Sequence, residues 1–364
     1  MEKVRRKLNK EQQRKLLRKV KVNMSKKSYI IPIFIPHKGC PHDCSFCNQK
    51  KIAGEVENNS EENIIEVINR YMELYPKPIT NLEIAFYGGS FTGLPIEKQV
   101  ELLTPAYRMK KKGYVKEIRL STRPDYINKE ILSILEQYGV SIIELGVQST
   151  DDHVLFLNKR GHTRKDIFKA VELVKKYDFR LGLQMMVGLF GDSGNTIKRT
   201  AEDIILLKPD FLRIYPTIVI KDTYLEILYK KGEYVPFTLE ETVDICKSLL
   251  LEFKENNIPV IRLGLQSTED IAYGKAIVAG PYHPAFREIV ESEIYKDLIE
   301  NNLRKYDGYE LKELTIYCHP SAASKVAGYK QSNKNYLINK YHLSKIIIKP
   351  YPSIEIDTVK LEVH

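Results

Sequence analysis

The chain has 364 residues, and its 57 lysines and arginines against 47 acidic residues give a formal net charge of +10. Hydrophobic residues make up 43% and charged residues 29% of the sequence, an ordinary globular composition that excludes a disordered, collagen-like or disulfide-scaffold protein. The length allows one large α/β barrel with an appendage, or two domains of roughly 150 residues each.

The first 28 residues hold the whole excess of positive charge. Met1–Ser28 contains 12 basic and 2 acidic residues, and the remainder contains 45 of each. We interpret residues 1–28 as a basic arm, disordered or helical, that is either a solvated tail or a surface for RNA or an acidic membrane face. In a third interpretation, the natural start is Met24.

Residues 29–305 alternate β-branched runs with amphipathic stretches. The predicted strands are Tyr29–Pro36, Leu82–Tyr87, Lys116–Ser121, Ile142–Val147, Arg180–Val187, Phe211–Ile220 and Pro259–Leu265. The predicted helices include Ser60–Leu74, Asn128–Tyr138, Arg164–Tyr177, Ser193–Leu207 and Leu239–Glu255. This alternation predicts parallel strands joined by right-handed crossovers, and seven strands fit a partial to complete (β/α) barrel.

A short repeat falls on three of these predicted strands. Leu145–Gln148, Leu181–Gln184 and Leu263–Gln266 all have the form Leu-Gly-x-Gln. Unless the match is a coincidence, it predicts that the three repeats face the same layer of the barrel lumen.

Residues 306–364 have a different pattern, which predicts a small α+β cap. The expected strands and the helix between the first two are Glu310–His319, Ser344–Lys349, Ile354–Glu362 and Ser332–Tyr341. A loop before the cap carries Tyr282 and His283 between two prolines and Phe286 shortly after the second. These rings either reach a substrate or pack the cap onto the barrel.

The cysteine count and the hydropathy pattern both bear on where in the cell the protein is located. Five cysteines, three of them clustered, do not form a disulfide framework, which favours a reducing cytoplasm. The sequence shows neither the apolar core of a secretory signal nor a stretch suited to spanning a membrane.

Three cysteines with the spacing C-x3-C-x2-C, Cys40, Cys44 and Cys47, directly follow the first predicted strand. Thiolates on one short loop can converge on one metal site. A zinc site needs four ligands, for which His37 or His42 is available. Three cysteines match better a [4Fe–4S] cluster with one open iron that can bind a further ligand.

With the aromatic Phe46 before its last cysteine, this motif resembles the radical S-adenosylmethionine (SAM) superfamily. Gly88-Gly89-Ser90 ends the second strand, where that family carries its Gly-Gly motif for the amino group of SAM. Later segments, in order, resemble the radical-SAM half of the Elongator catalytic subunit family: Ser121–Asp125, Leu145–Thr150, Asn158–Thr163, Met185–Leu189 and Arg213–Thr217. The layout is more distantly similar to oxygen-independent coproporphyrinogen oxidase.

The resemblance implies a set of site residues. It assigns the [4Fe–4S] cluster to Cys40, Cys44 and Cys47. It assigns contacts with SAM to Phe46, Gly88, Gly89, Ser90, Gln148, Arg160 and Gln184. Ser121 stands where relatives usually carry a glutamate, so the resemblance assigns no ribose contact to this position.

The implied function is a radical enzyme that forms a 5′-deoxyadenosyl radical and modifies an unidentified substrate, with tRNA a candidate. It would receive electrons from a flavodoxin or ferredoxin. The alternatives are a non-catalytic iron–sulfur or SAM-binding module and an enzyme like coproporphyrinogen oxidase. The acetyltransferase half of the Elongator subunit has no recognisable counterpart after residue 305, so we do not expect the complete Elongator reaction from this chain alone.

Overall fold

The computed structural model of the chain describes residues 28–35, 44–48, 60–76, 81–265, 273–306 and 308–364. Except for Ser28, the predicted basic arm over residues 1–28 lies outside this part. Cys40 and the alternative zinc ligands His37 and His42 also lie outside it.

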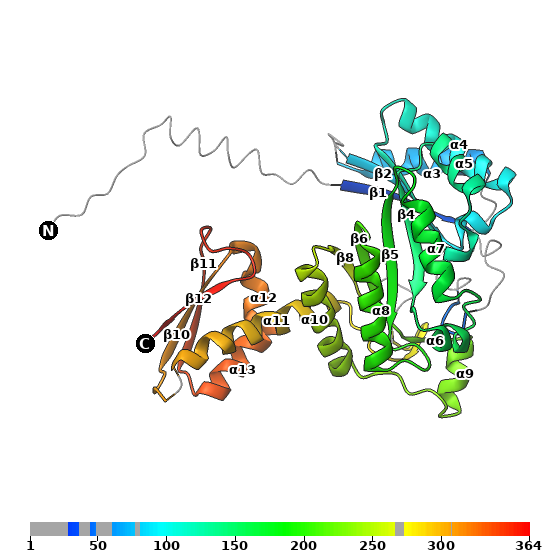
Figure 1. Cartoon of the computed structure of the whole chain (residues 1–364). Helices are drawn as coiled ribbons and strands as arrows, with labels where there is room; N and C mark the ends of the chain where they lie inside the picture. Colours follow the sequence, from blue (N-terminus) through cyan, green and yellow to red (C-terminus); the bar gives the residue numbers. More distant parts are fainter. Residues whose placement is uncertain (1–27, 36–43, 49–59, 77–80, 266–272, 307) are drawn as a thin grey trace, which may run out of the picture.

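Seven parallel strands form one curved sheet in the larger lobe (Figure 1). In sheet order they are β1 (Ser28–Ile35), β2 (Asn81–Gly88), β3 (Glu117–Thr122), β4 (Ile142–Gln148), β5 (Arg180–Val187), β6 (Phe211–Pro216) and β8 (Val260–Leu263). Among the described residues no pairing joins the edge strands β1 and β8, so the barrel is open on one side. The predicted (β/α) barrel is confirmed in its partial form.

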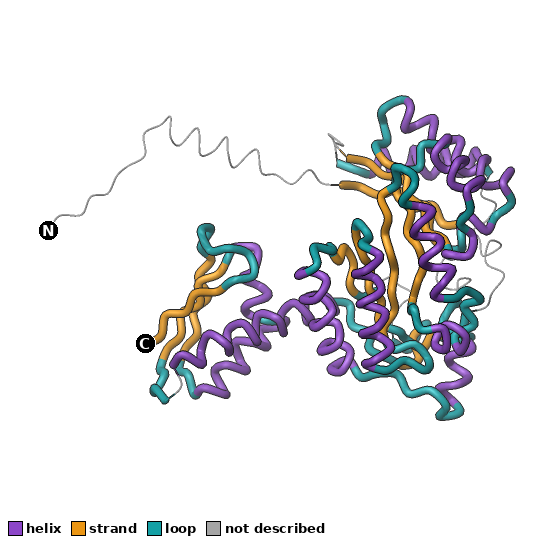
Figure 2. The backbone as a smooth tube through the Cα atoms, in the orientation of Figure 1, coloured by secondary structure: helices purple, strands orange, loops and turns teal. Residues whose placement is uncertain are grey.

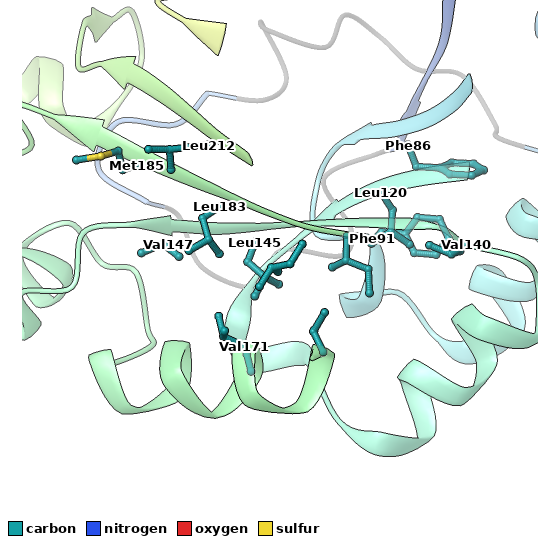
Figure 3. Packing of buried hydrophobic residues seen from close by; sticks show 14 of the residues in the cluster. Phe86, Phe91, Leu120, Val140, Leu145, Val147, Val171, Leu183, Met185 and Leu212 are labelled. Carbon is teal, nitrogen blue, oxygen red and sulfur yellow. The ribbon is translucent and has the colours of Figure 1, made fainter. Parts of the chain in front are cut away.

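Helices pack along the outer face of this sheet (Figure 2). They are α3 (Glu61–Leu74), α4 (Ile96–Lys111), α5 (Lys129–Gln137), α6 (Asp152–Leu157), α7 (Arg164–Val174), α8 (Gly194–Leu207) and α10 (Leu239–Glu255). The short helix α9 (Tyr224–Lys230) instead packs against Val219 and Phe46, away from this face. Alternate strand residues are buried beneath them: Leu145 of β4 and Leu183 of β5 point toward the helix that carries Val171 (Figure 3). The other residues of each strand therefore face the lumen.

The strand predicted over Phe211–Ile220 is divided in two. β6 ends at Pro216, whose nitrogen has no hydrogen to donate to a neighbouring strand. The chain then forms β7 (Val219–Ile220), which pairs antiparallel with β9 (Ile277–Ala279). This two-stranded sheet lies at the carboxyl end of the barrel strands, beside the candidate site.

The three Leu-Gly-x-Gln repeats do not occupy one layer. Leu145 pairs with Leu183 rather than Leu181, so the second repeat is two residues out of step with the first. Ile214 pairs with both Met185 and Leu263, which places the third repeat two residues out of step in the opposite direction. A barrel's stagger shifts successive strands in one direction, so it does not account for offsets of opposite sign. The prediction of a shared lumen layer is wrong.

The smaller lobe is a three-stranded sheet with helices packed on one face (Figure 2). Its strands, in sheet order, are β11 (Lys345–Pro350), β10 (Glu313–Cys318) and β12 (Val359–Val363). Its helices are α11 (Phe286–Leu303), α12 (Ala323–Ala327) and α13 (Ser332–Tyr341). The small α+β cap is thus present, while the division of the chain between residues 305 and 306 stays a prediction.

Helix α11 belongs to both lobes. Val290, near its start, lies in the barrel core, whereas Ile299 and Leu303 lie in the core of the cap. In the loop before α11, the His283 ring contacts the ring of Tyr329 in the cap, with centroids 5.0 Å apart. This contact favours the packing interpretation of the loop. Among the described residues, no helix combines the length and apolar character that crossing a membrane requires.

Candidate functional site

A cavity of about 310 Å³ lies at the carboxyl ends of the barrel strands. Five of the residues that the sequence predicted as ligand contacts line it: Phe46, Cys47, Gly88, Gln148 and Gln184. A larger hollow of about 570 Å³ between α10, α11 and the cap contains none of them. The structure therefore brings together residues from four separate motifs at the smaller hollow.

The described part of the cysteine loop is anchored by backbone hydrogen bonds. Ser45 donates its N–H to the carbonyl of Asn158 at 3.1 Å, and its own carbonyl accepts from the N–H of Leu225 at 2.7 Å. The Ser45 hydroxyl also donates to Oδ1 of Asn158 at 2.6 Å. These bonds fix the neighbouring thiols: Cys44 is buried, and Cys47 is partly exposed at the cavity.

Phe46 packs between the cysteines and a helix. Its ring joins an apolar cluster that contains Leu225 and Leu228 of α9 and the buried Tyr234. The same residue lines the cavity. The aromatic position of the motif thus anchors the loop, besides facing the space where SAM is expected.

Arg160 places its guanidinium against the cysteine loop. One terminal nitrogen donates to Sγ of Cys44 at 3.2 Å, and the other donates to the carbonyl of Gly146 at 2.6 Å. The side chain is buried, and its Nε has no hydrogen-bond partner among the described residues. No carboxylate in the described part of the chain lies within ion-pair distance of it. Because burying an unpaired charge is costly, this site fits an anionic ligand.

The residues behind Arg160 do not supply that negative charge. Arg123 forms two hydrogen bonds with the carboxylate of Asp125, at 3.0 and 2.9 Å, and also donates to the carbonyl of Arg160. Burial and the nearby Arg160 lower the pKa of His162 to about 3, so its ring is neutral near neutral pH. The one acid in this group is already paired with Arg123.

The structure explains why a glycine is needed at position 88, independently of any ligand. Gly88 has φ +101°, and a Cβ there would lie 2.7 Å from the carbonyl oxygen of Ile35. A side chain at Gly88 would therefore separate β1 from β2. Gly89 follows in the same turn, and its N–H donates to the carbonyl of Ile35 at 3.4 Å.

Ser90 is buried and connects this turn to β3. Its hydroxyl lies 2.8 Å from the hydroxyl of Thr122 and accepts the N–H of Arg123 at 3.2 Å. The side chain therefore holds the end of β3 against the short helix η2 (Phe91–Gly93). Its predicted contact with SAM stays a prediction.

Two glutamines from neighbouring strands reach the cavity in different ways. Gln148 has φ +67°, a left-handed conformation that is costly for a residue with a side chain, and it follows a register shift at the end of β4. Its Oε1 is buried and has no partner among the described residues. Gln184 instead donates to Oε2 of Glu144 at 3.0 Å. Gln148 therefore has an acceptor available for a ligand.

A buried ion-pair network that no sequence motif predicted lies below the cavity. Arg119 of β3 bonds Glu83 of β2 at 2.8 Å and Glu144 of β4 at 2.9 Å. Arg213 of β6 pairs with Glu144 at 2.6 Å, and its side chain lines the cavity. One charged residue near the middle of each of four apolar strands was the available signal.

The chain matches two family models. The model of the Radical SAM superfamily matches residues 34–204. The model of the Radical_SAM C-terminal domain matches residues 209–296. An uncharacterized protein of Methanocaldococcus jannaschii, MJ0486, is 34% identical over 262 residues, which are 69% of this chain and 79% of that protein.

Two further relatives extend the comparison. The tRNA uridine(34) acetyltransferase of M. jannaschii is 26% identical over 269 residues, 63% of this chain, and the match spans 50% of that protein's length. The solved structure of Methanocaldococcus infernus Elp3, lacking residues 1–46, shares the fold with a TM-score of 0.58 at 23% identity, over 76% of this chain and 64% of that one. The chain therefore belongs to the radical SAM superfamily and is an enzyme that uses a [4Fe–4S] cluster and S-adenosylmethionine.

Proposed function

We propose that Cys40, Cys44 and Cys47 hold the cluster and that the adjoining cavity takes SAM together with part of the substrate. The observation that carries this proposal is the buried guanidinium of Arg160, which contacts Sγ of Cys44 at 3.2 Å without a carboxylate partner among the described residues. A cluster bound by three thiolates has a net negative charge, and SAM carries a carboxylate. Either supplies the missing counter-charge.

The other contacts follow from the cavity lining. With SAM bound, the turn of Gly88, Gly89 and Ser90 would hold its amino acid part, Phe46 would cover it, and the side-chain Oε1 of Gln148 would accept one of its hydrogen bonds. Gln184, held by Glu144, presents a fixed amide from the neighbouring strand β5. These residues orient the ligand and exclude water.

When bound, the reduced cluster and SAM together supply a 5′-deoxyadenosyl radical, which abstracts a hydrogen atom from the substrate. The apolar wall of the cavity, which includes Met186, Ile218 and Leu265, offers no polar hydrogen that would stabilise a stray water beside that radical. Among the described residues that line the cavity, Arg213 carries a positive charge, and its ion pair with Glu144 balances that charge. It is therefore available to orient a polar substrate group without adding net charge.

The test is anaerobic reconstitution with iron and sulfide, followed by dithionite and SAM. We expect the wild-type protein to form 5′-deoxyadenosine and Cys44→Ala to form none. Cys246→Ala is the matched control, because Cys246 is buried in α10 and burial raises the pKa of its thiol to about 12. Absence of 5′-deoxyadenosine from reconstituted wild-type protein would overturn the proposal.

For the substrate we propose tRNA, in a reducing cytoplasm. The support is the similarity to tRNA uridine(34) acetyltransferases, of which the chain spans about half the length. We expect a deletion strain to lack at least one modified tRNA nucleoside, to be measured by mass spectrometry of digested tRNA. Complementation with the wild-type gene should restore it and complementation with Cys44→Ala should not. Identical nucleoside profiles in the deletion and parent strains would contradict tRNA as substrate.

A further inference from the structure

The sheet of the cap has an edge at β12 that no described strand covers. Glu313 of β10 and His364, directly after β12, exchange both of their backbone hydrogen bonds, each at 3.0 Å. In an antiparallel pair, residues bonded in this way alternate with residues whose N–H and C=O groups point away from the partner strand. The regular register of β12 with β10 therefore directs the backbone groups of Val359, Leu361 and Val363 out of the sheet.

The core of the cap is partly open at the same edge. Val359, Leu361 and Val363 pack against this core but stay partly exposed, and so does Leu298 of the neighbouring helix α11. The C-terminus, directly after β12, lies at the side of the cap far from the barrel (Figure 1). The barrel therefore leaves this end of the strand uncovered. A strand edge with free backbone groups and apolar side chains is a template for a further strand.

The sequence of β12 is complementary to itself when the strand is reversed. Leu361 is its middle residue, with Lys360 and Glu362 on either side and a valine at each end. Antiparallel pairing of two copies about a two-fold axis at Leu361 sets Lys360 of each copy opposite Glu362 of the other. In this register the outward backbone groups of the two strands also meet each other. Lys360 and Glu362 then occupy the pairs without hydrogen bonds, where opposite side chains are closest and unlike charges attract.

The opposite edge of the sheet, β11, carries features that prevent such pairing. Pro350 ends the strand and has no N–H to donate. Lys345 and Lys349 are both exposed. A two-fold pairing of β11 about Ile347 would set these two lysines opposite each other, and like charges in that position repel. The charge pattern therefore favours pairing at β12 and disfavours it at β11.

We propose that β12 pairs with β12 of a second copy of this chain, which joins the two three-stranded cap sheets into one continuous sheet. The two-fold axis is perpendicular to the sheet, so the helices of both caps lie on one face, where Leu298 and Leu361 of each copy gain cover. A symmetric contact of this kind closes after two copies. The paired strands are short and bury a modest area, so we expect a dimer that dissociates on dilution. The contact does not depend on the proposed function.

The test reverses single charges of β12 in the full-length protein and measures mass by sedimentation velocity over a series of micromolar concentrations. Wild-type protein should approach twice the 42.2 kDa of one chain at the highest concentration. Lys360→Glu sets glutamates opposite each other at both symmetric positions, and Glu362→Lys sets lysines opposite each other. Either variant alone should weaken the dimer by about tenfold or more. Lys165→Glu, at an exposed site on α7 of the barrel, changes the net charge as Lys360→Glu does and is the matched control.

Mixing the two single variants gives a readout that a general loss of stability would not produce. In a mixed pair, both cross-strand positions join a glutamate to a lysine, so an equimolar mixture should recover the dimer. The double variant Lys360→Glu/Glu362→Lys reverses the order of the charges and should dimerise by itself.

Wild-type protein that stays monomeric throughout the series would overturn the proposal and leave this edge to a strand of another protein. A wild-type dimer that both single variants retain would also overturn it, because another surface would then join the copies. The same holds if Lys165→Glu weakens the dimer as much as Lys360→Glu, or if the mixture of folded variants stays monomeric. Should a single variant fail to fold, the double variant decides: a folded double variant that is monomeric contradicts the proposal, and a dimeric one supports it.

Discussion

Arg160 donates from one guanidinium nitrogen to Sγ of Cys44 at 3.2 Å and from the other to the carbonyl of Gly146 at 2.6 Å. Its positive charge stabilises the reduced form of an adjacent cluster, which is the more negative form. Arg160→Gln should therefore lower the reduction potential of the cluster, and Arg160→Lys should lower it less because the charge is retained. The measurement is a redox titration followed by electron paramagnetic resonance, without SAM. Equal potentials in Arg160→Gln and wild type would contradict this role.

His162 makes the stability of the protein sensitive to acid. Its pKa is lowered to about 3 in the folded chain, first by burial and then by Arg160. Between pH 6.5 and pH 3 the unfolded chain therefore binds a proton at this residue that the folded chain does not, so stability falls as pH falls through this window. From pH 7 to pH 5 the loss should be about 2 kcal/mol.

His162→Asn removes this titration and keeps the side chain small. The free energy of unfolding, measured by urea titration at pH 7 and pH 5, should therefore fall by less in this variant than in wild type. The comparison of two pH differences cancels the contributions of other groups, such as Asp192, whose pKa burial raises to about 6. The same difference in both proteins would mean that His162 is protonated in the folded chain.

Residue patterns predicted the site only where a motif is local. The cysteine spacing and Gly88-Gly89 were visible because all their members lie within a few positions of each other. The network of Glu83, Arg119 and Glu144 was not, because it depends on which strands are neighbours and on their register. The left-handed conformation of Gln148 likewise follows from a register shift that no short pattern encodes.

Among helices and strands, sequence periodicity predicted those elements that bury a single face against one neighbouring layer. The helices of the barrel bury one face each, so their apolar residues repeat regularly, and α10 and α13 begin and end where expected. The central strands are instead recognised as continuous apolar runs, because all seven residues of β4 are buried. Helix α11 was not among the predicted helices. Its apolar residues change sides along its length, because Val290 faces the barrel and Ile299 faces the cap. No single stripe marks such a helix.

The contact between β5 and β6 depends on a glycine. A Cβ at Gly182 would lie 2.3 Å from Cε2 of Phe211, whose ring is buried beneath the guanidinium of Arg119. Gly182→Ala should therefore lower the free energy of unfolding by about 1–3 kcal/mol, the usual cost of overpacking a core. Gly194→Ala, at a site with no atom within 4 Å of the new Cβ, should leave it unchanged or slightly raised. Urea unfolding measures both, and equal midpoints for the two variants would show that Phe211 moves aside freely.

In the whole molecule, the excess positive charge is confined to residues 1–28, and residues 29–364 have no net charge. Residues after Ser28 contain 45 basic and 45 acidic residues, so the net positive charge that would attract RNA is contributed by residues 1–28. A chain that begins at Met24 loses 10 of the 12 basic residues of this segment. Because contacts with phosphates release bound counterions, affinity that depends on them falls steeply as salt rises.

We therefore expect the chain that begins at Met24 to bind tRNA about tenfold more weakly than the full chain at low salt, and the two affinities to converge at high salt. Fluorescence anisotropy with labelled tRNA across a salt series measures both the affinity and its slope. A full-length variant with residues 2–23 in scrambled order keeps the charge and should bind like wild type. If that variant binds like the shortened chain, a specific sequence in the arm is recognised rather than its charge. Equal affinities and slopes for the shortened and full chains would show that the arm does not contact tRNA.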